Sequence, residues 1–191
     1  MEKEKIKEHF DDISKDYDIY KKRNKFYYKA LKRMLVREVG FGKKVLDVGC
    51  GTGELLDFLK PSYGLGIDVS EGMIEKAKEK YDLDFKVGDV ENLEEGDYDF
   101  VLLVDVVEHL SDVRKSFNEL RKFKKVLVSF VNPLFEPLLM IMEKLKLKME
   151  EGPHNRISIK EMKKIFRENG FRVVKEKYEL FGLIKYFVLE K

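Results

Sequence analysis

The sequence predicts an α/β fold built around a largely parallel sheet, and two observations lead to this prediction. From residue 44 onward, short apolar runs typical of buried strands alternate with stretches of helical periodicity. Repeated strand–helix units of this kind place helices on both faces of a parallel sheet. The length of 191 residues suits one substantial α/β domain with its own core, and no internal repeat or low-complexity linker divides the chain.

Two helices are expected over residues 1–40, ahead of the first strand. Apolar residues recur at helical spacing in both of them. The apolar residues of the first expected helix are Ile6, Phe10, Ile13, Tyr17 and Tyr20, and those of the second are Phe26, Ala30, Leu31, Met34 and Leu35. Gly40 and Gly42 then end the helical region.

Five strand candidates follow, at residues 45–48, 65–68, 84–87, 100–104 and 126–130. Ser70 is placed to cap the helix after the second strand. Near the C-terminus, Ser158 and Glu161 form a capping box for a helix that ends at Asn169 and Gly170. Strands at 171–175 and 186–189 follow without room for a crossover helix, so they either pair antiparallel or lie apart in the sheet.

The composition argues against several classes of protein. Charged residues make up 39% of the chain, but the net charge is only +2, so no global charge favours nucleic acid. The single Cys50 cannot form an internal disulfide. We expect no signal peptide and no apolar run approaching the roughly 20 residues of a membrane span. The predicted protein is cytoplasmic and has no metal site, and its Lys/Glu-rich composition favours a heat-adapted source.

The segment from Val45 to Leu56 carries the main functional signal, because a strand runs directly into a glycine-rich turn and then a helix. Ligands of open α/β sheets bind at this end of the strands, and Asp68 closes the next strand, where a carboxylate accepts hydrogen bonds from ribose hydroxyls. The spacing is G-x-G-x-G, and Glu54 stands where a dinucleotide site has its third glycine. A carboxylate there repels a pyrophosphate, so a nicotinamide dehydrogenase is the weaker interpretation.

Four segments in order resemble the motifs of class I S-adenosylmethionine-dependent methyltransferases, especially the ubiquinone/menaquinone-biosynthesis-like branch. They are residues 47–53 (DVGCGTG), 66–73 (GIDVSEGM), 88–91 (GDVE) and 98–110 (YDFVLLVDVVEHL). The resemblance implies a Rossmann-like three-layer sandwich with a seven-stranded, mostly parallel sheet whose last strand is antiparallel. It implies one methyltransferase domain over 1–191, with a helical cap (1–42), a cofactor-binding core (43–131), a lid-like insertion (132–156) and a C-terminal helix and strand pair (157–191).

The resemblance also implies a role for each motif in binding S-adenosylmethionine. Asp47 and the glycine loop hold the amino acid end, Asp68 the ribose, Asp89 with Val90 the adenine, and Asp105 lies near the transferring methyl. The N-terminal segment closes over the cofactor, and its Arg23 is expected to meet the cofactor carboxylate. The full set of cofactor-binding candidates is Asp47, Gly49, Cys50, Gly51, Gly53, Asp68, Val69, Met73, Asp89, Val90, Asp105, Tyr20 and Arg23.

A general base is needed if the acceptor is an oxygen or nitrogen that must lose a proton, and histidine has the suitable pKa range. His109 and His154 are the candidates, with a structural role as the alternative for each. Tyr17 is a further catalytic candidate on the N-terminal segment.

The insertion at 132–156 is rich in Leu, Phe and Met, with lysines interleaved. It is either a packed extra helix or a lid over an apolar substrate, with transient contact to a membrane surface in the second case. The segment weakly resembles methyltransferases associated with glycosyltransferases. We therefore expect in-line methyl transfer to a small or lipid- or glycan-linked molecule, by a monomer or homodimer.

Two rival functions remain open at this point. Basic residues along the second helix favour an RNA methyltransferase if they do not simply form a solvated face. They are Lys21, Lys22, Arg23, Lys25, Lys29, Lys32, Arg33 and Arg37. The other rival is a catalytically inactive cofactor-binding protein.

Overall fold

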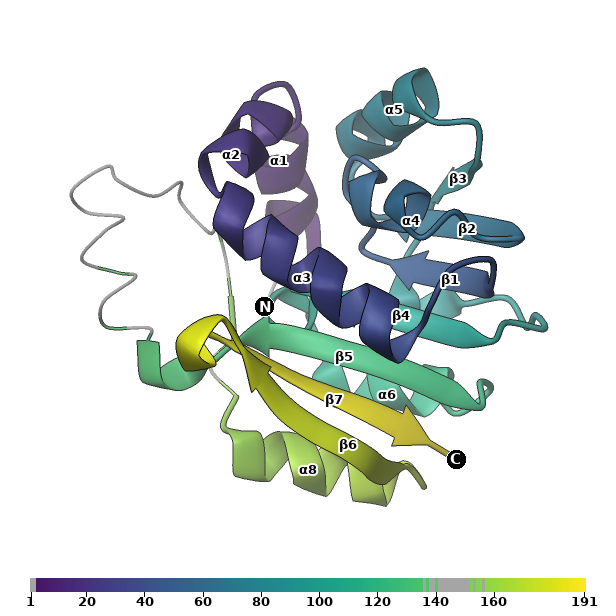
Figure 1. Cartoon of the computed structure of the whole chain (residues 1–191), viewed down its shortest axis with the longest axis vertical. Helices are drawn as coiled ribbons and strands as arrows, with labels where there is room; N and C mark the ends of the chain where they lie inside the picture. The colour runs from purple at the N-terminus through teal and green to yellow at the C-terminus, as the bar shows by residue number, and fades with distance from the viewer. Residues whose placement is uncertain (1–2, 136, 138–139, 141–151, 153, 156) are drawn as a thin grey trace.

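The computed structural model describes residues 3–135, 137, 140, 152, 154–155 and 157–191. Seven strands form one sheet in the order β3-β2-β1-β4-β5-β7-β6 (Figure 1). The strands are β1 (Lys44–Val48), β2 (Tyr63–Asp68), β3 (Asp84–Val87), β4 (Phe100–Val104), β5 (Lys125–Val131), β6 (Arg172–Glu179) and β7 (Ile184–Glu190). The pairs from β3 to β5 are parallel, and β7 runs antiparallel to both β5 and β6. This arrangement confirms the predicted fold class.

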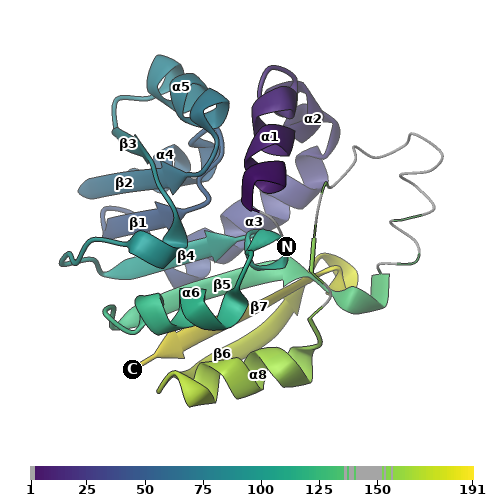
Figure 2. The ribbon, with the colours of Figure 1, turned by 180° about the vertical axis from the view of Figure 1, so that it is seen from behind.

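Helices cover both faces of the sheet, so the molecule has three layers (Figures 1 and 2). They are α1 (Lys3–Ile13), α2 (Tyr17–Arg23), α3 (Lys25–Glu38), α4 (Glu54–Phe58), α5 (Glu71–Lys80), α6 (Val113–Leu120) and α8 (Ile159–Glu168). Short 3₁₀ turns lie at η1 (Val90–Asn92), η2 (Val107–His109), η3 (Pro133–Phe135) and η4 (Leu180–Gly182). One apolar core joins α6 and α8 to the sheet, and the other joins α3, α4 and α5 to the opposite face.

The N-terminal region has three helices where the periodicity predicted two. Ser14 ends α1, because both its backbone N–H and its hydroxyl donate to the carbonyl of Asp11, the hydroxyl at 2.8 Å. Asn24 separates α2 from α3, and its side-chain amide donates to the Tyr20 carbonyl at 3.2 Å. Short polar side chains that bond to nearby backbone compete with the helix, so the apolar repeat continues across breaks that it does not reveal.

The far end of α3 is fixed to the sheet by a buried carboxylate. The Glu38 side chain is 1% exposed and accepts hydrogen bonds from Arg37 Nε at 2.9 Å, Tyr186 Oη at 2.9 Å and Lys175 Nζ at 2.5 Å. The bonds from Lys175 and Tyr186 connect α3 to β6 and β7, and the bond from Arg37 lies within α3. The orientation of α3 matters for function, because its first residues reach the site described below.

The predicted C-terminal helix and antiparallel strand pair are present, but both strands are longer than predicted. The Ser158 hydroxyl accepts from Glu161 N at 3.2 Å, and Gly170 ends α8 with a φ of +78°. β6 and β7 pair antiparallel and are longer than the predicted strands at 171–175 and 186–189. The extra residues of β6 are mostly exposed and charged, since this strand forms the edge of the sheet.

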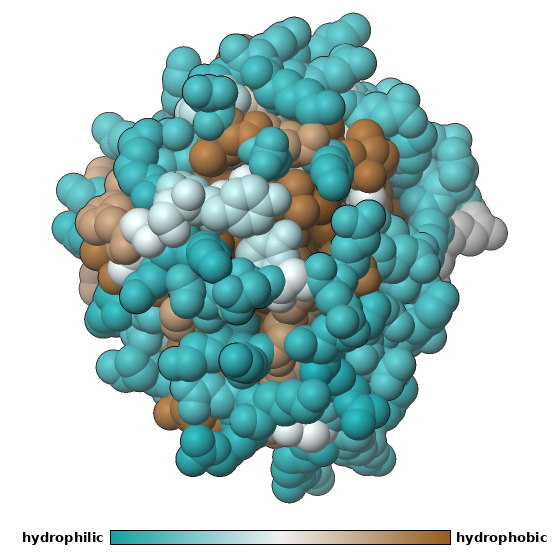
Figure 3. Space-filling view, turned by 90° about the vertical axis from the view of Figure 1, so that its right-hand side faces the viewer, coloured by the Kyte–Doolittle hydropathy of each residue, from teal (hydrophilic) through white to brown (hydrophobic). Residues whose placement is uncertain are grey.

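Hydrophilic residues cover most of the surface on one side of the molecule (Figure 3). On the side that carries α4, α5 and β1 to β3, Figure 3 shows hydrophilic colour over most of the surface and brown patches near the centre. Within the described part of the chain, no helix has the length and apolar character that crossing a membrane requires. Most of the predicted insertion at 132–156 lies outside the described residues, so its role as a lid stays a prediction.

Candidate functional site

The glycine loop after β1 depends on its glycines for both conformation and space. Gly49, Gly51 and Gly53 have φ values of +73°, +51° and +79°, a region that side chains disfavour. A Cβ at Gly49 would lie 2.4 Å from the Val106 side chain, and one at Gly53 would lie 2.7 Å from the Phe85 ring. The loop therefore packs directly against the segment after β4 and against β3, which brings three strand ends close together.

Asp68 ties this loop to the end of β2. Its Oδ2 accepts from the backbone N–H of Gly51 at 2.8 Å, and its Oδ1 accepts from Ser70 N at 3.0 Å. Burial raises the pKa of Asp68, although the hydrogen bonds from Ser70 and Gly51 oppose the shift. The Ser70 hydroxyl caps α5 by accepting from Met73 N at 3.1 Å, as predicted.

Asp47 is 3% exposed and lies just behind the loop. Burial, and then the charge of Asp68, raise the pKa of Asp47 to about 7, while the ammonium of Lys21 opposes the shift. A carboxylate in this state gains most from a cationic ligand group, because such a group favours its charged form.

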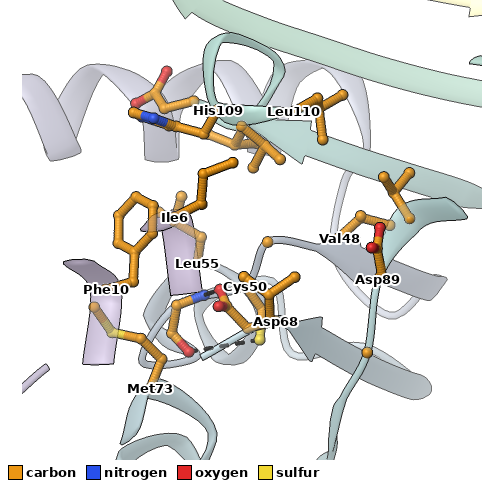
Figure 4. A pocket seen from close by; sticks show the side chains of 18 of the residues that line it. Ile6, Phe10, Val48, Cys50, Leu55, Asp68, Met73, Asp89, His109 and Leu110 are labelled. Atoms are coloured by element: carbon orange, nitrogen blue, oxygen red, sulfur yellow. Dashed lines mark hydrogen bonds between the residues drawn. The ribbon is translucent and has the colours of Figure 1, made fainter. Parts of the chain in front are cut away.

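These elements enclose one cavity, which the ends of β1 to β4 line from below and α1 to α3 from above. Figure 4 shows Ile6 and Phe10 of α1 extending into it between Asp68 and His109. The predicted site residues that line the cavity are Tyr17, Gly49, Cys50, Gly51, Asp68, Val69, Met73, Asp89, Val90, Asp105 and His109. Residues from four separate motifs are thus brought together.

Five predicted residues do not line the cavity: Asp47, Gly53, Tyr20, Arg23 and His154. Arg23 is exposed to solvent at the end of α2. His154 interacts through Nδ1 with the carbonyl of Gly152 at 3.1 Å, and Gly53 forms the N-cap of α4. None of these five residues belongs to the lining of the cavity.

Lys21 lines the cavity and is a residue that the sequence analysis did not assign to the site. It is 7% exposed, and its ammonium donates to Thr52 Oγ1 at 2.9 Å and lies 3.5 Å from Glu54 Oε2. The same ammonium is 5.1 Å from the ring centroid of Tyr17 and 5.6 Å from that of Tyr28. Burial lowers the pKa of Lys21, although Glu54 and Asp18 oppose the shift. The cavity therefore holds an ammonium beside the glycine loop.

Helix α1 is bound to the loop after β3. Lys3 Nζ lies 2.7 Å from Asp89 Oδ2 and 2.7 Å from Glu91 Oε2. Burial alone would raise the pKa of Glu91, but hydrogen bonds from Lys115, Lys3 and Ser111 outweigh it and lower the pKa to about 2. Asp89 also accepts from Glu91 N through Oδ1 at 3.0 Å, so the loop has a fixed shape.

The end of β4 presents Asp105 in an unusual backbone conformation. Its φ is +57°, in the left-handed region. Tyr27 Oη donates to Asp105 Oδ2 at 2.8 Å, and Ser129 Oγ lies 3.5 Å from Oδ1. Nearby, His109 on η2 packs edge-on against Phe10, with ring centroids 5.2 Å apart. Among the described residues, no cluster of His, Cys, Asp and Glu is arranged to hold a metal ion.

Comparison with known proteins finds a family match over part of this chain. Residues 45–126 match the family described as methyltransferase domain. An uncharacterized protein of Methanocaldococcus jannaschii is 41% identical over 78 residues, covering 40% of this chain and 30% of that protein. The malonyl-(acyl-carrier protein) O-methyltransferase of Acetivibrio thermocellus is 30% identical over 128 residues, covering 63% and 45% respectively. The chain spans less than half the length of these two relatives.

Solved structures share the fold over nearly the whole chain. An S-adenosylmethionine-dependent methyltransferase of Thermotoga maritima has a TM-score of 0.77 at 21% identity and covers 97% of this chain and 99% of its own. Magnesium protoporphyrin IX methyltransferase of Synechocystis, with bound S-adenosylhomocysteine, has a TM-score of 0.70 at 20% identity, with 90% and 85% covered. The protein in complex with the Trm112 methyltransferase activator of Haloferax volcanii has a TM-score of 0.79 at 20% identity, with 95% and 96% covered.

The match to the methyltransferase domain covers residues 45–126, which include the glycine loop and the ends of β1, β2 and β4. The solved structures that share the fold include S-adenosylmethionine-dependent methyltransferases. The recognition made from the four motifs is thereby confirmed at the level of the class. Assignment to the ubiquinone/menaquinone-like branch stays a prediction.

Proposed function

We propose that this chain is an S-adenosylmethionine-dependent methyltransferase acting on a small or lipid- or glycan-linked molecule by direct in-line transfer. The single observation that carries the proposal is the convergence of the glycine loop, Asp68 and Asp89 on one cavity. The bound cofactor supplies an electrophilic methyl group on a sulfonium, so the tasks of the protein are binding, alignment and control of water.

The residues of the cavity fit this cofactor better than a dinucleotide. The carboxylate of Asp68 suits ribose hydroxyls, and Asp89 with Val90 lies where the adenine is expected. Glu54 occupies the first turn of α4 and pairs with Lys32 at 2.7 Å, so the helix start presents a carboxylate rather than a site for pyrophosphate. A nucleoside without phosphates is the matching ligand.

Lys21 replaces Arg23 in our proposal for the group that binds the carboxylate of the cofactor. Its ammonium lies beside Thr52 of the glycine loop, whereas Arg23 is exposed outside the cavity. A buried ammonium gains from a charged partner, and charge-assisted hydrogen bonds are the stronger kind. Asp47, just behind the loop, would favour the ammonium of the same amino acid group through its charge.

For the catalytic candidates, we propose His109 as the group that accepts a proton, since it lines the cavity on the β4 side. Burial raises the pKa of Tyr17, so this hydroxyl remains protonated near neutral pH and can orient a ligand but cannot act as a base. His154 lies outside the lining, and its catalytic role stays a prediction.

The RNA alternative is weakened by the fate of the basic residues on α2 and α3. Lys21 is buried in the cavity, Lys32 pairs with Glu54, and Arg37 pairs with Glu38 at 2.9 Å. The remaining exposed basic residues are those of a solvated face on a lysine-rich protein. Retention on RNA that falls steeply with added salt would favour the alternative.

Calorimetry with the cofactor product and a truncated analogue tests the proposal. S-adenosylhomocysteine carries the amino acid group and methylthioadenosine lacks it. We expect Lys21→Met to weaken binding of S-adenosylhomocysteine about 10- to 100-fold, because a hydrogen bond to a charged group contributes roughly 1.5–3 kcal/mol. Binding of methylthioadenosine should not change, and Lys22→Met, on the exposed neighbour, should change neither affinity.

Each failure of this test has a distinct meaning. Folded protein that binds neither compound would refute the proposal. Binding of NADH in place of S-adenosylhomocysteine would favour a dehydrogenase. Cofactor binding without methyl release, measured over a broad mixture of acceptors, would favour the inactive cofactor-binding protein.

A further inference from the structure

The turn η2 and the residues around it form one wall of the cavity. Asp105, Val106, His109, Leu110 and Ser111 all belong to the lining, and Figure 4 shows His109 and Leu110 next to each other there. The proposed function gives His109 a proton to accept, so its imidazole must lie within hydrogen-bond reach of that proton. A misplacement of about 1 Å costs about 100-fold in rate, so the support of this turn matters for function.

The turn has little support from its own backbone. It spans only three residues, and 3₁₀ turns have poorer hydrogen-bond geometry than α-helices. His109 N donates to Val106 O at 2.9 Å, but Leu110 N lies 3.4 Å from Val107 O, which is long for such a bond. On the side of the glycine loop, the Val106 side chain fills the space beside Gly49. The rest of the turn depends on contacts from other parts of the chain.

Asn155 contacts the turn through two hydrogen bonds. Its backbone N–H donates to the Glu108 carbonyl at 2.6 Å, and its side-chain amide donates to the Leu110 carbonyl. These two carbonyls lie on either side of His109 along the chain. The peptide that joins Glu108 to His109 thus has both of its polar groups bonded, because His109 N already donates within the turn. Since a peptide is planar, its fixed orientation helps to set the direction in which the His109 side chain leaves the backbone.

A residue close to Asn155 in the sequence contacts α1. A Cβ at Gly152 would lie 2.4 Å from the ring of His9, so the backbone there packs directly against that ring. His9 and Phe10 are in edge-on contact with ring centroids 5.3 Å apart, and Phe10 packs in the same way against His109 at 5.2 Å. Gly152 and Asn155 therefore contact α1 and η2, the two elements whose rings meet in the cavity.

We propose that Asn155 is a positioning residue, whose side-chain amide holds the Leu110 carbonyl and thereby keeps the His109 imidazole against Phe10 in the wall of the cavity. The inference rests on the proposed function, which gives His109 its role as proton acceptor. Asn155 is not part of the lining, so it acts through the turn. The sequence analysis selected the neighbouring His154 as a catalytic candidate and did not assign a role to Asn155.

Nuclear Overhauser contacts between the rings of His109 and Phe10 test this role without a methyl acceptor. The His109 signals are identified by their absence from His109→Gln. The intensity varies with the inverse sixth power of distance, so a separation that grows by about 1 Å from 5.2 Å weakens the contact roughly threefold. We expect at least this loss in Asn155→Ala, which removes the amide. Asn155→Asp should show the same loss, because it keeps the side-chain shape but places a carboxylate oxygen opposite the Leu110 carbonyl.

Asn169→Ala is the matched control, because the Asn169 amide also donates to a backbone carbonyl, that of Ile165 at 2.9 Å, at the end of α8. It should lower the stability of the fold and keep the full ring contact.

A ring contact that survives in either Asn155 variant, or that is also lost in Asn169→Ala, would overturn the proposal. The contact is compared in the absence of ligand, and binding of S-adenosylhomocysteine is measured separately by calorimetry, so failure of the cofactor assignment is recognised by itself. Methyl release that is unchanged in His109→Gln would refute the proton-acceptor role, while the ring contact would still decide whether Asn155 positions the imidazole.

Discussion

Substitution of Asp68 separates its two roles, because the same carboxylate shapes the glycine loop and is proposed to bind ribose. Its oxygens accept from Gly51 N at 2.8 Å and Ser70 N at 3.0 Å. In Asp68→Asn the single carbonyl oxygen keeps one of these bonds, while the amide N–H₂ faces the other donor. Loss of one bond to a charged group should lower the free energy of unfolding by roughly 1.5–3 kcal/mol.

The cofactor role predicts a second and separable effect. At a S-adenosylhomocysteine concentration of about 100 times its Kd, the ligand stabilises the wild type by about 2.7 kcal/mol. If Asp68→Asn weakens binding about 100-fold, the same concentration adds only about 0.4 kcal/mol. Urea denaturation with and without the ligand measures both quantities on one variant.

A capping substitution far from the cavity provides the control. Ser158 caps α8, so Ser158→Ala should lower the free energy of unfolding by about 1 kcal/mol and keep the full increment from the ligand. An unchanged increment in Asp68→Asn, alongside reduced stability, would refute the ribose assignment and leave Asp68 with a purely structural role.

Two other substitutions test the electrostatics. The pKa of Asp47 is raised to about 7 in the folded protein, so the folded state binds more protons than the unfolded state below that pH. Stability should therefore fall as the pH rises from about 5 to 7, and Asp47→Asn should flatten this slope in urea denaturation; equal slopes would contradict the shift. Glu38→Gln should lower the free energy of unfolding by about 1–3 kcal/mol, because it weakens the bonds from Arg37, Lys175 and Tyr186. The ligand increment should stay unchanged, and undiminished stability would show that the connection from α3 to the sheet contributes little.

Much of the site was predictable from local sequence because the relevant residues adjoin strand ends. Asp68 ends β2, and the glycine loop, Asp89 and Asp105 each come just after a strand, and parallel strands bring their carboxyl ends to one edge. The capping residues Ser70 and Ser158 were likewise identified by their spacing to the helices they begin.

The covering helices were harder to predict, for a geometrical reason. Lys21 and Arg23 are two positions apart on α2, which is a rotation of about 200° around the helix. Because the chain breaks at Ser14, α2 is a separate helix whose buried face cannot be extrapolated from that of α1. The apolar repeat that starts at Ile6 therefore could not show which basic residue of α2 faces the cavity. Phe10 lines the cavity, but its place in the apolar repeat did not distinguish it from a core residue, because both kinds of position are apolar.

Cys50 lies in the wall of the cavity, where the proposed function would make its thiol sensitive to a bound ligand. It is the one cysteine of the chain, is 7% exposed and belongs to the glycine loop. Burial, then the charges of Asp68 and Asp47, raise the pKa of Cys50, so its sulfur stays a slowly reacting thiol near neutral pH. If the nucleoside binds in this cavity as we propose, a thiol label would compete with it for the same space, and the rate of labelling would report cofactor binding with no engineered residue required.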